Sequence, residues 1–254
     1  MNVTFEIRHL KNEADWKQLG AFLSGASQLG AFLGGASDVV SCVIRHLMLS
    51  NVVSYLVENP YIDRDYSSDY RFFYAQTFRT YDRHCKRVHF FAEDVGAIFA
   101  LPNWNERVKA LQATSLRSYF GFCVIRPLPN ASIGRSVLKM RGPEGKDLES
   151  VITCRADVRA NLLGAELDVC GAAFMQQDSR VGACAQIAIW MGARHMHQRY
   201  RQLAFCSGHH KACRTDNVRR VHVIARGIGF LDVRAHDPRR QRNGLPAALL
   251  QGQT

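Results

Sequence analysis

The sequence lacks a segment typical of a transmembrane helix. The nearest candidate, residues 18–37, has no charge over 20 residues, but half of these residues are Gly, Ser or Gln. Moving so polar a segment into a bilayer is unfavourable. The N-terminus, MNVTFEIRHLKNEADW, also lacks the charged start, the apolar run and the small-residue cleavage site of a secretory signal. We therefore expect a cytoplasmic protein that does not bind membranes.

The chain also lacks a compact cysteine framework. Its eight cysteines are scattered from Cys42 to Cys213, whereas disulfide scaffolds are short chains with closely spaced cysteines. The cysteines are therefore expected to be reduced thiols. A composition of 47% hydrophobic and 22% charged residues excludes disorder of the whole chain. At 254 residues the chain can bury the core of one large domain or two small ones.

Acidic residues are scarce in the last part of the chain. Residues 199–254 contain ten Arg and one Lys but only three Asp and no Glu, so they carry +8 of the total net charge of +11. An arginine-rich tail can bind nucleic-acid phosphates. No aromatic platform for stacking bases accompanies it, so nucleic-acid binding ranks below the other hypotheses.

Two ligand-binding motifs are incomplete. CSGHHKAC (206–213) contains two Cys and two His, but structural zinc sites draw their ligand pairs from two separate places. Gly134-Arg135-Ser136 lacks the Gly-rich run and the Lys-Ser/Thr ending of a phosphate-binding loop. We expect no metal and no cofactor.

Helix and strand patterns are mixed along the chain. Apolar residues at steps of three and four predict a helix over 63–81, started by Asp63 or Asp65, and another over 103–112. A third helix begins near Gly182. The class is therefore α+β, with an α/β region at the N-terminus. Strand-forming residues before turns predict four strands: residues 51–60, 87–93, 119–129 and 165–174.

The uncharged residues 18–37 are a tandem duplication, QLGAFLSGAS followed by QLGAFLGGAS. Ten residues are not a whole number of helical turns, and two copies are too few for a solenoid. The Gly and Ser content favours a loose connection.

Cys184 lies at the start of the third predicted helix, in MQQDSRVGACAQIAIW (175–190). Asp178 and Ser179 can cap this helix, and Gly182 permits a tight entry. In the first turn of a helix, unpaired N–H groups and the positive end of the macrodipole stabilise a thiolate. The same groups can donate to an oxyanion formed on an attacked carbonyl. Cys184 is thus a candidate nucleophile, with simple packing of a small buried residue, or a redox or regulatory thiol, as the alternatives.

A Gln several residues before a Gly-Ala-Cys-Ala helix start resembles the nucleophile region of the papain-like cysteine peptidases, including those that cleave bacteriocin leaders. The resemblance covers Gln177 to Trp190. It implies that Cys184 attacks an amide or ester carbonyl of a peptide or protein substrate, that Gln177 helps form the oxyanion hole, and that a later His and Asn or Asp complete the site. The family usually spaces Gln and Cys by six residues; Gln177 lies seven before Cys184, and Asp178 occupies the sixth position.

The catalytic base must lie away from the helix of Cys184. His195 and His197 are on the same predicted helix, about 16 to 20 Å from Cys184 at a rise of 1.5 Å per residue, so neither can reach the thiol. His222 lies in RRVHVIARGIGF, a strand-like segment, and is the candidate base among the later histidines.

The composition changes after about residue 200, as a shift of reading frame in a GC-rich gene would change it. On this hypothesis residues 201–254 are not the native continuation, and the protein is a truncated, bacterial-type relative with a nucleophile and no base. We expect an N-terminal region of unknown role (1–165), a papain-like nucleophile segment (166–200) and a basic tail (201–254). Two other functions stay open: a non-catalytic interaction or structural protein, and a nucleic-acid binder that uses the tail.

Overall fold

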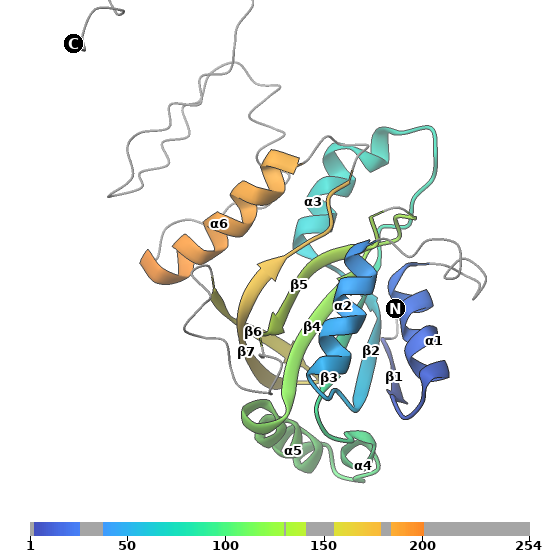
Figure 1. The fold of residues 1–254 in the computed structure, drawn as a ribbon, viewed down its shortest axis with the longest axis vertical. Helices are drawn as coiled ribbons and strands as arrows, with labels where there is room; N and C mark the ends of the chain where they lie inside the picture. Colours follow the sequence, from blue (N-terminus) through green and yellow to red (C-terminus); the bar gives the residue numbers. More distant parts are fainter. Residues whose placement is uncertain (1–2, 26–37, 130, 141–154, 179–183, 201–254) are drawn as a thin grey trace, which may run out of the picture. The chain divides into compact units, whose positions relative to one another are not determined.

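A seven-stranded antiparallel sheet with helices on both faces forms the centre of the protein (Figure 1). The computed structural model describes residues 3–25, 38–129, 131–140, 155–178 and 184–200. These belong to the first of the two units into which the chain divides, Met1–Lys211. In sheet order the strands are β1 (Thr4–His9), β2 (Ser54–Tyr61), β3 (Cys85–Phe91), β4 (Tyr119–Ile125), β5 (Ile133–Lys139), β7 (Ala165–Phe174) and β6 (Ala156–Leu162).

Seven helical elements accompany the sheet within the described residues. No helix among them is long and apolar enough to cross a membrane. With helices and an antiparallel sheet, the fold class is mixed α+β. In chain order the helical elements are α1 (Glu13–Leu23), α2 (Asp38–Leu49), α3 (Arg64–Phe72), the 3₁₀ turn η2 (Tyr74–Gln76), α4 (Gly96–Phe99), α5 (Trp104–Arg117) and α6 (Cys184–Tyr200).

Every strand pair in the described part of the chain is antiparallel. The expected α/β organisation of the N-terminal region is therefore wrong, because that class is built on a mostly parallel sheet. Helices between strands do occur: α3 lies between β2 and β3, and α5 between β3 and β4. Here they connect antiparallel neighbours. The alternation of elements along the sequence does not determine the direction of the strands.

One face of the sheet is covered by α1 and α2. Within β3, Val88 and Phe90 belong to the core on this face, whereas Phe91 belongs to the core on the other, as the two-residue period of a strand requires. The helices contribute a stripe of buried apolar residues to this core: Leu19, Leu23, Val40, Val43, Ile44 and Leu47.

The opposite face is covered by α3, α5 and α6. Tyr66 of α3, Leu111 of α5 and Trp190 of α6 are buried there, and Trp190 has no exposed surface. Burial of a large apolar side chain contributes about 2–3 kcal/mol relative to its exposed state. Apolar packing thus holds α6, which contains Cys184, against this face of the sheet.

The predicted strands and helices exist, but several of their ends differ. The strand 165–174 is β7, and the helix predicted over 103–112 extends to Arg117. The strand predicted over 51–60 continues past Pro60 to Tyr61, because a shift of register between Glu58 and Tyr61 accommodates the proline. The helix predicted over 63–81 ends already at Phe72 and is followed by η2.

The expectation of a loose connection over residues 18–37 is wrong for its first part. Residues 18–23 complete α1, whose start is set by a capping box in which Asn12 and Asp15 each bond the other's backbone. Leu19 and Leu23 of α1 are fully buried, so apolar packing outweighs the Gly and Ser content. Residues 26–37 lie outside the described residues.

Candidate active site

The described part of the helix α6 runs from Cys184 to Tyr200, and the expected start near Gly182 lies outside the described residues. The first N–H groups of a helix have no partner within it, and this end carries the positive pole of the macrodipole. Both stabilise a thiolate. The side chains described in α6 run from Ile187 to His197. Among these, Ile187 and Trp190 are buried against the sheet.

The chain that follows β7 is held against the sheet up to Asp178. The Gln176 N–H donates to the Ile133 carbonyl at 2.9 Å, and Gln176 Oε1 accepts from the Ile133 N–H at 3.2 Å. Asp178 is buried and accepts a hydrogen bond from the Tyr74 hydroxyl. Gln177, between these two anchors, is exposed. The predicted oxyanion donor is thus presented to solvent by a segment that is bound on both sides of it.

The side chain six residues before Cys184 cannot act as an oxyanion donor. Asp178 stands at that position, and an ionised carboxylate only accepts hydrogen bonds. A negative group would also repel an oxyanion, whereas an amide N–H stabilises it. Gln177 therefore remains the candidate donor, although its spacing is seven.

Arg126 is the deepest anchor of this segment. It follows β4, is 4% exposed, and donates from Nη2 to the Gln176 carbonyl at 2.8 Å and to the Ile133 carbonyl at 3.1 Å. Burial lowers the pKa of its guanidinium, while the charges of Asp69 and Asp63 oppose this shift. A cation that donates to two buried carbonyl groups ties the end of β7 to β5.

No base for Cys184 is identified among the described histidines. His195 and His197 lie on α6, as expected, and are too far along the helix. His222, the predicted base, lies outside the described residues. The remaining described histidines contact other groups: His9 contacts Asp94, His46 the Lys139 carbonyl, His84 Asp82, and His89 the Tyr119 hydroxyl.

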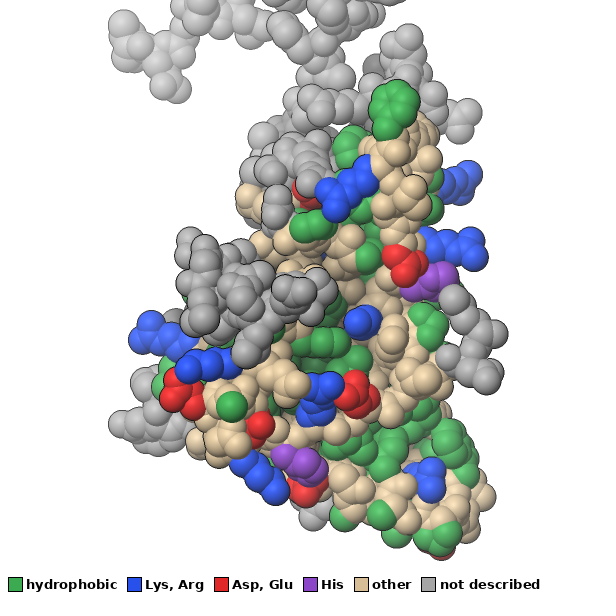
Figure 2. Space-filling model, turned by 90° about the vertical axis from the view of Figure 1, so that its right-hand side faces the viewer, with side chains coloured by type: hydrophobic (Ala, Val, Ile, Leu, Met, Phe, Trp, Pro, Cys, Tyr) green, Lys and Arg blue, Asp and Glu red, His purple; other side chains and the backbone are tan. Residues whose placement is uncertain are grey.

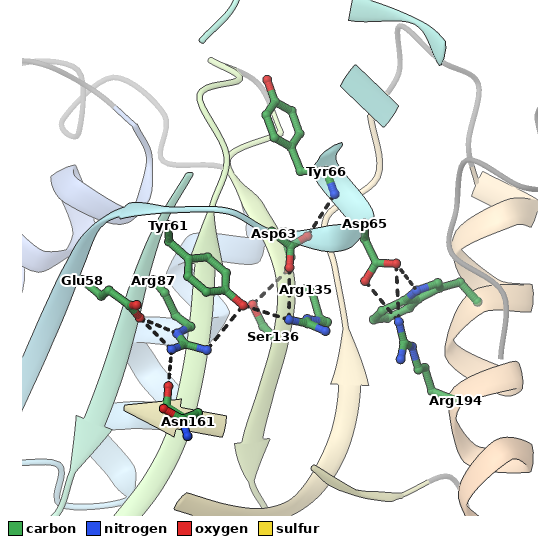
Figure 3. A network of polar contacts seen from close by, with 12 residues as sticks. Glu58, Tyr61, Asp63, Asp65, Tyr66, Arg87, Arg135, Ser136, Asn161 and Arg194 are labelled. Atoms are coloured by element: carbon green, nitrogen blue, oxygen red, sulfur yellow. Dashed lines mark hydrogen bonds and ion pairs between the residues drawn. The ribbon is translucent and has the colours of Figure 1, made fainter. Parts of the chain in front are cut away.

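A buried polar network lies on the face of the sheet that α3 and α6 cover (Figure 3). At one end, Arg87 of β3 binds Glu58 of β2, with Nε at 2.8 Å and Nη2 at 2.7 Å from Oε2. Arg87 also donates to the Tyr61 hydroxyl at 3.3 Å and to the Asn161 carbonyl of β6. This side chain therefore links strands that are far apart in the sequence.

The middle of the network contains Asp63 and Arg135. Arg135 Nη2 lies 3.1 Å from the Tyr61 hydroxyl and 3.2 Å from Asp63 Oδ1. The other oxygen of Asp63 accepts from the Tyr66 N–H at 2.9 Å, which confirms Asp63 as the N-cap of α3. Arg135 is part of β5, so the residues 134–136 are a strand and form no phosphate-binding loop.

Asp65 forms the other end of the network and contacts α6. Its Oδ1 lies 3.3 Å from Trp190 Nε1, and its Oδ2 lies 3.2 Å from Arg194 Nη2. Burial raises the pKa of Asp65, as does the charge of Asp63, while Arg194 and Arg135 oppose the rise. The sequence pattern identified Asp65 only as a possible helix start. Its partners, 125 and 129 residues later, leave no local signal.

The network is balanced in charge, with three carboxylates and three guanidinium groups in contact: Glu58 with Arg87, Asp63 with Arg135, and Asp65 with Arg194. A balanced set needs no further ion. In the described residues no group of three or more His, Cys, Asp and Glu could hold a metal ion. We interpret the network as a structural connection between the sheet and α6.

Charges on one face of the described part are mixed rather than gathered by sign. Figure 2 shows basic and acidic side chains beside one another on one face. Exposed ion pairs such as Arg8 with Glu6 and Arg159 with Asp168 contribute to this pattern. The basic tail and the CSGHHKAC segment lie outside the described residues.

Comparisons with known proteins identify no relative: no protein-family model, no curated protein and no solved structure matches the chain.

Proposed function

We propose that the chain is a cysteine hydrolase of the papain-like type, with Cys184 as the nucleophile. The observation that carries the proposal is that Cys184 is the first described residue of α6, since unpaired N–H groups in the first turn of a helix favour a thiolate and an oxyanion. The exposed Gln177 adds a neutral donor close before it in the sequence. We also propose a cytoplasmic location, where the thiol stays reduced.

In the proposed reaction, the Cys184 sulfur forms a bond to the carbonyl carbon of a peptide or protein substrate. The carbonyl π electrons move to oxygen, and the Cys184 N–H and the Gln177 side chain donate to the resulting oxyanion. Expulsion of the amine or alcohol, which takes a proton from the base, leaves a thioester that water hydrolyses. His222 is our candidate base. The reaction requires no cofactor.

The proposal predicts that Cys184 is more acidic than a free thiol. We expect iodoacetamide to modify Cys184 with an apparent pKa well below the free value of about 8.5. The measurement is the rate of labelling of the folded protein from pH 5 to 9, with the modified cysteine identified by mass spectrometry and Cys184→Ala as the blank. Protection of Cys184 until the protein unfolds would instead indicate packing and a non-catalytic protein.

The chain contains its own references for this experiment. Cys42 is exposed and serves as the reference for the labelling rate, whereas Cys85 and Cys123 are buried. Burial raises the pKa of Cys123 to about 12, and burial also raises that of Cys85. Both should stay unlabelled while the protein is folded.

The same labelling on a His222→Gln variant tests the candidate base. If His222 pairs with the thiolate, its loss raises the apparent pKa of Cys184. An unchanged pKa would show that His222 is not the base that pairs with Cys184.

A further inference from the structure

The sheet ends in two edge strands, β1 on one side and β6 on the other (Figure 1). The β6 edge is in contact with other elements: the Asn161 carbonyl accepts a hydrogen bond from Arg87 of β3, and the Arg155 carbonyl, just before β6, contacts His195 of α6. In the described part of the chain, no group makes such a contact with the outer side of β1. The β1 edge is therefore the one that can accept a further strand.

The backbone of β1 presents hydrogen-bonding groups on this outer side. The Leu10 N–H donates to the Val53 carbonyl at 2.8 Å, and the Thr4 hydroxyl donates to the Asn59 carbonyl at 2.9 Å. These two carbonyls thus face β1, which sets the alternation of inward and outward residues along an antiparallel pair. The backbone N–H and C=O groups that point away from β2 are those of Phe5, Ile7 and His9.

The devices that usually block a sheet edge are missing from β1. Proline, a bulge and charges of one sign are typical protections of an edge strand. The strand TFEIRH contains no proline or glycine, and its register with β2 continues without a shift. Its two charged residues have opposite signs: Arg8 Nη2 lies 2.6 Å from Glu6 Oε1, and both side chains reach solvent. This edge can therefore pair with a strand of complementary charge.

We propose that β1 pairs antiparallel with β1 of a second copy of the chain, around a two-fold axis at Ile7. The two sheets then continue into one. In this register Glu6 lies opposite Arg8 of the second copy, and Arg8 lies opposite its Glu6, as the symmetry of such an interface requires. The pairing is independent of the proposed hydrolase function.

The charges of β1 select this register. Moving the second strand by one step in either direction places Glu6 opposite Glu6, or Arg8 opposite Arg8. A parallel pair in register also brings like charges together, and like charges directly opposite are destabilising. Glu6 and Arg8 belong to the pairs without hydrogen bonds at the new interface, in which side chains approach more closely. The strand is thus complementary to its own reversed copy.

The other side of β1 carries apolar residues. Phe5 and Ile7 are half-buried and pack against the core under α3, α5 and α6. In the proposed pair, Ile7 meets Ile7 of the second copy at the axis, and Phe5 meets its His9. Association therefore covers apolar surface that the single copy leaves exposed, while the outward backbone groups gain partners.

The experiment is sedimentation velocity of the full chain at concentrations from about 1 to 100 μM. We expect the wild type to show an equilibrium between monomer and dimer. Glu6→Arg and Arg8→Glu should each weaken the dimer by about tenfold or more, because two pairs of opposite charge become two pairs of like charge.

A mixture of the two variants tests the register itself. In a mixed dimer of Glu6→Arg with Arg8→Glu, every charge across the interface again lies opposite its counterpart. The mixture should therefore form dimers that neither variant forms alone. The double variant, with both substitutions in one chain, restores the complementary pattern and should also dimerise.

Arg159→Glu is the matched control. It also reverses an exposed arginine that is ion-paired on an edge strand, but this strand is β6. Its dimer should be as stable as that of the wild type. Protection of the buried Cys85 and Cys123 from iodoacetamide shows that each variant is folded.

A wild type that stays monomeric at the highest concentration would contradict the proposal. So would a dimer that neither Glu6→Arg nor Arg8→Glu weakens, or a loss in both variants without recovery in their mixture. Dissociation by Arg159→Glu would place the interface on the other edge of the sheet and overturn the proposal as well. Loss in the single variants, recovery in the mixture and an unchanged Arg159→Glu dimer would support it.

Discussion

At the scale of single residues, burial sets the protonation state of His89 on the face of the sheet under α3 and α6. His89 is 0% exposed, and its Nδ1 lies 2.9 Å from the Tyr119 hydroxyl. Burial lowers the pKa of His89 to about 4, with the charge of Arg87 acting in the same direction against the influence of Glu58. The ring is therefore neutral at pH 7, and its Nδ1 contacts Tyr119 rather than a catalytic partner.

This burial predicts a specific loss of stability in acid. Below pH 6.5 the unfolded chain protonates His89, but the folded protein does so only near pH 4, so protons favour unfolding in this window. We expect His89→Gln, in which this titration is absent, to lose about 3 kcal/mol less than wild type between pH 7 and 4. Urea unfolding at several pH values measures this difference.

Wild type measured in parallel under the same conditions is the reference. Equal pH dependence of His89→Gln and wild type would contradict the neutral, buried state of His89.

At the scale of secondary-structure elements, β4 depends on one glycine. Gly121 has φ +131°, and a Cβ added there would lie 2.2 Å from the Val137 carbonyl oxygen of β5. Both the backbone conformation and the close approach of the neighbouring strand exclude a side chain. The register of β3 against β4 shifts next to this residue, between Phe90 and Phe91.

Gly121→Ala should therefore destabilise the protein by about 3 kcal/mol or more, because the added methyl group forces β4 and β5 apart. Gly192→Ala in α6 is the matched substitution, since no atom lies within 4 Å of its added Cβ. In a helix interior this change should stabilise by up to about 1 kcal/mol. Urea unfolding of both variants tests the pair. Similar stability of Gly121→Ala and wild type would show that β4 and β5 do not approach as described.

At the scale of the whole described unit, one sheet is shared by two cores. Phe90 and Phe91 are adjacent on β3, both have no exposed surface, and they belong to opposite cores. Loss of either core therefore removes the support of the same strands. The two faces should unfold as one cooperative unit.

We expect Phe90→Ala and Phe91→Ala each to cost about 3–5 kcal/mol and to lower the unfolding midpoint of both cores together. Trp16 packs against the core between the sheet and α1 and α2, whereas Trp190 lies in the core on the opposite face of the sheet. Fluorescence of two versions of the protein, each with one of these tryptophans as the only one, follows the cores separately. Different midpoints within one variant would contradict a single unit.

Local features of the chain could be read without a structure. Periodicity, together with residues that cap or interrupt an element, predicts the strand β7 and the helices α5 and α6. These signals depend on neighbours within about four residues. The candidate nucleophile also rests on such a local signal. The helix predicted over 63–81 was too long because η2 interrupts a pattern whose spacing continues.

The direction and order of the strands, and the contacts that support α6, were decided only by the tertiary structure. Strand β7 pairs between β5 and β6, and Asp65 meets Arg194 from 129 residues away. Aspartate at a helix start and arginine near a helix end look like surface residues in the sequence. They become partners because folding buries the aspartate and brings the arginine beside it, and a buried charge is stable only beside its counterpart.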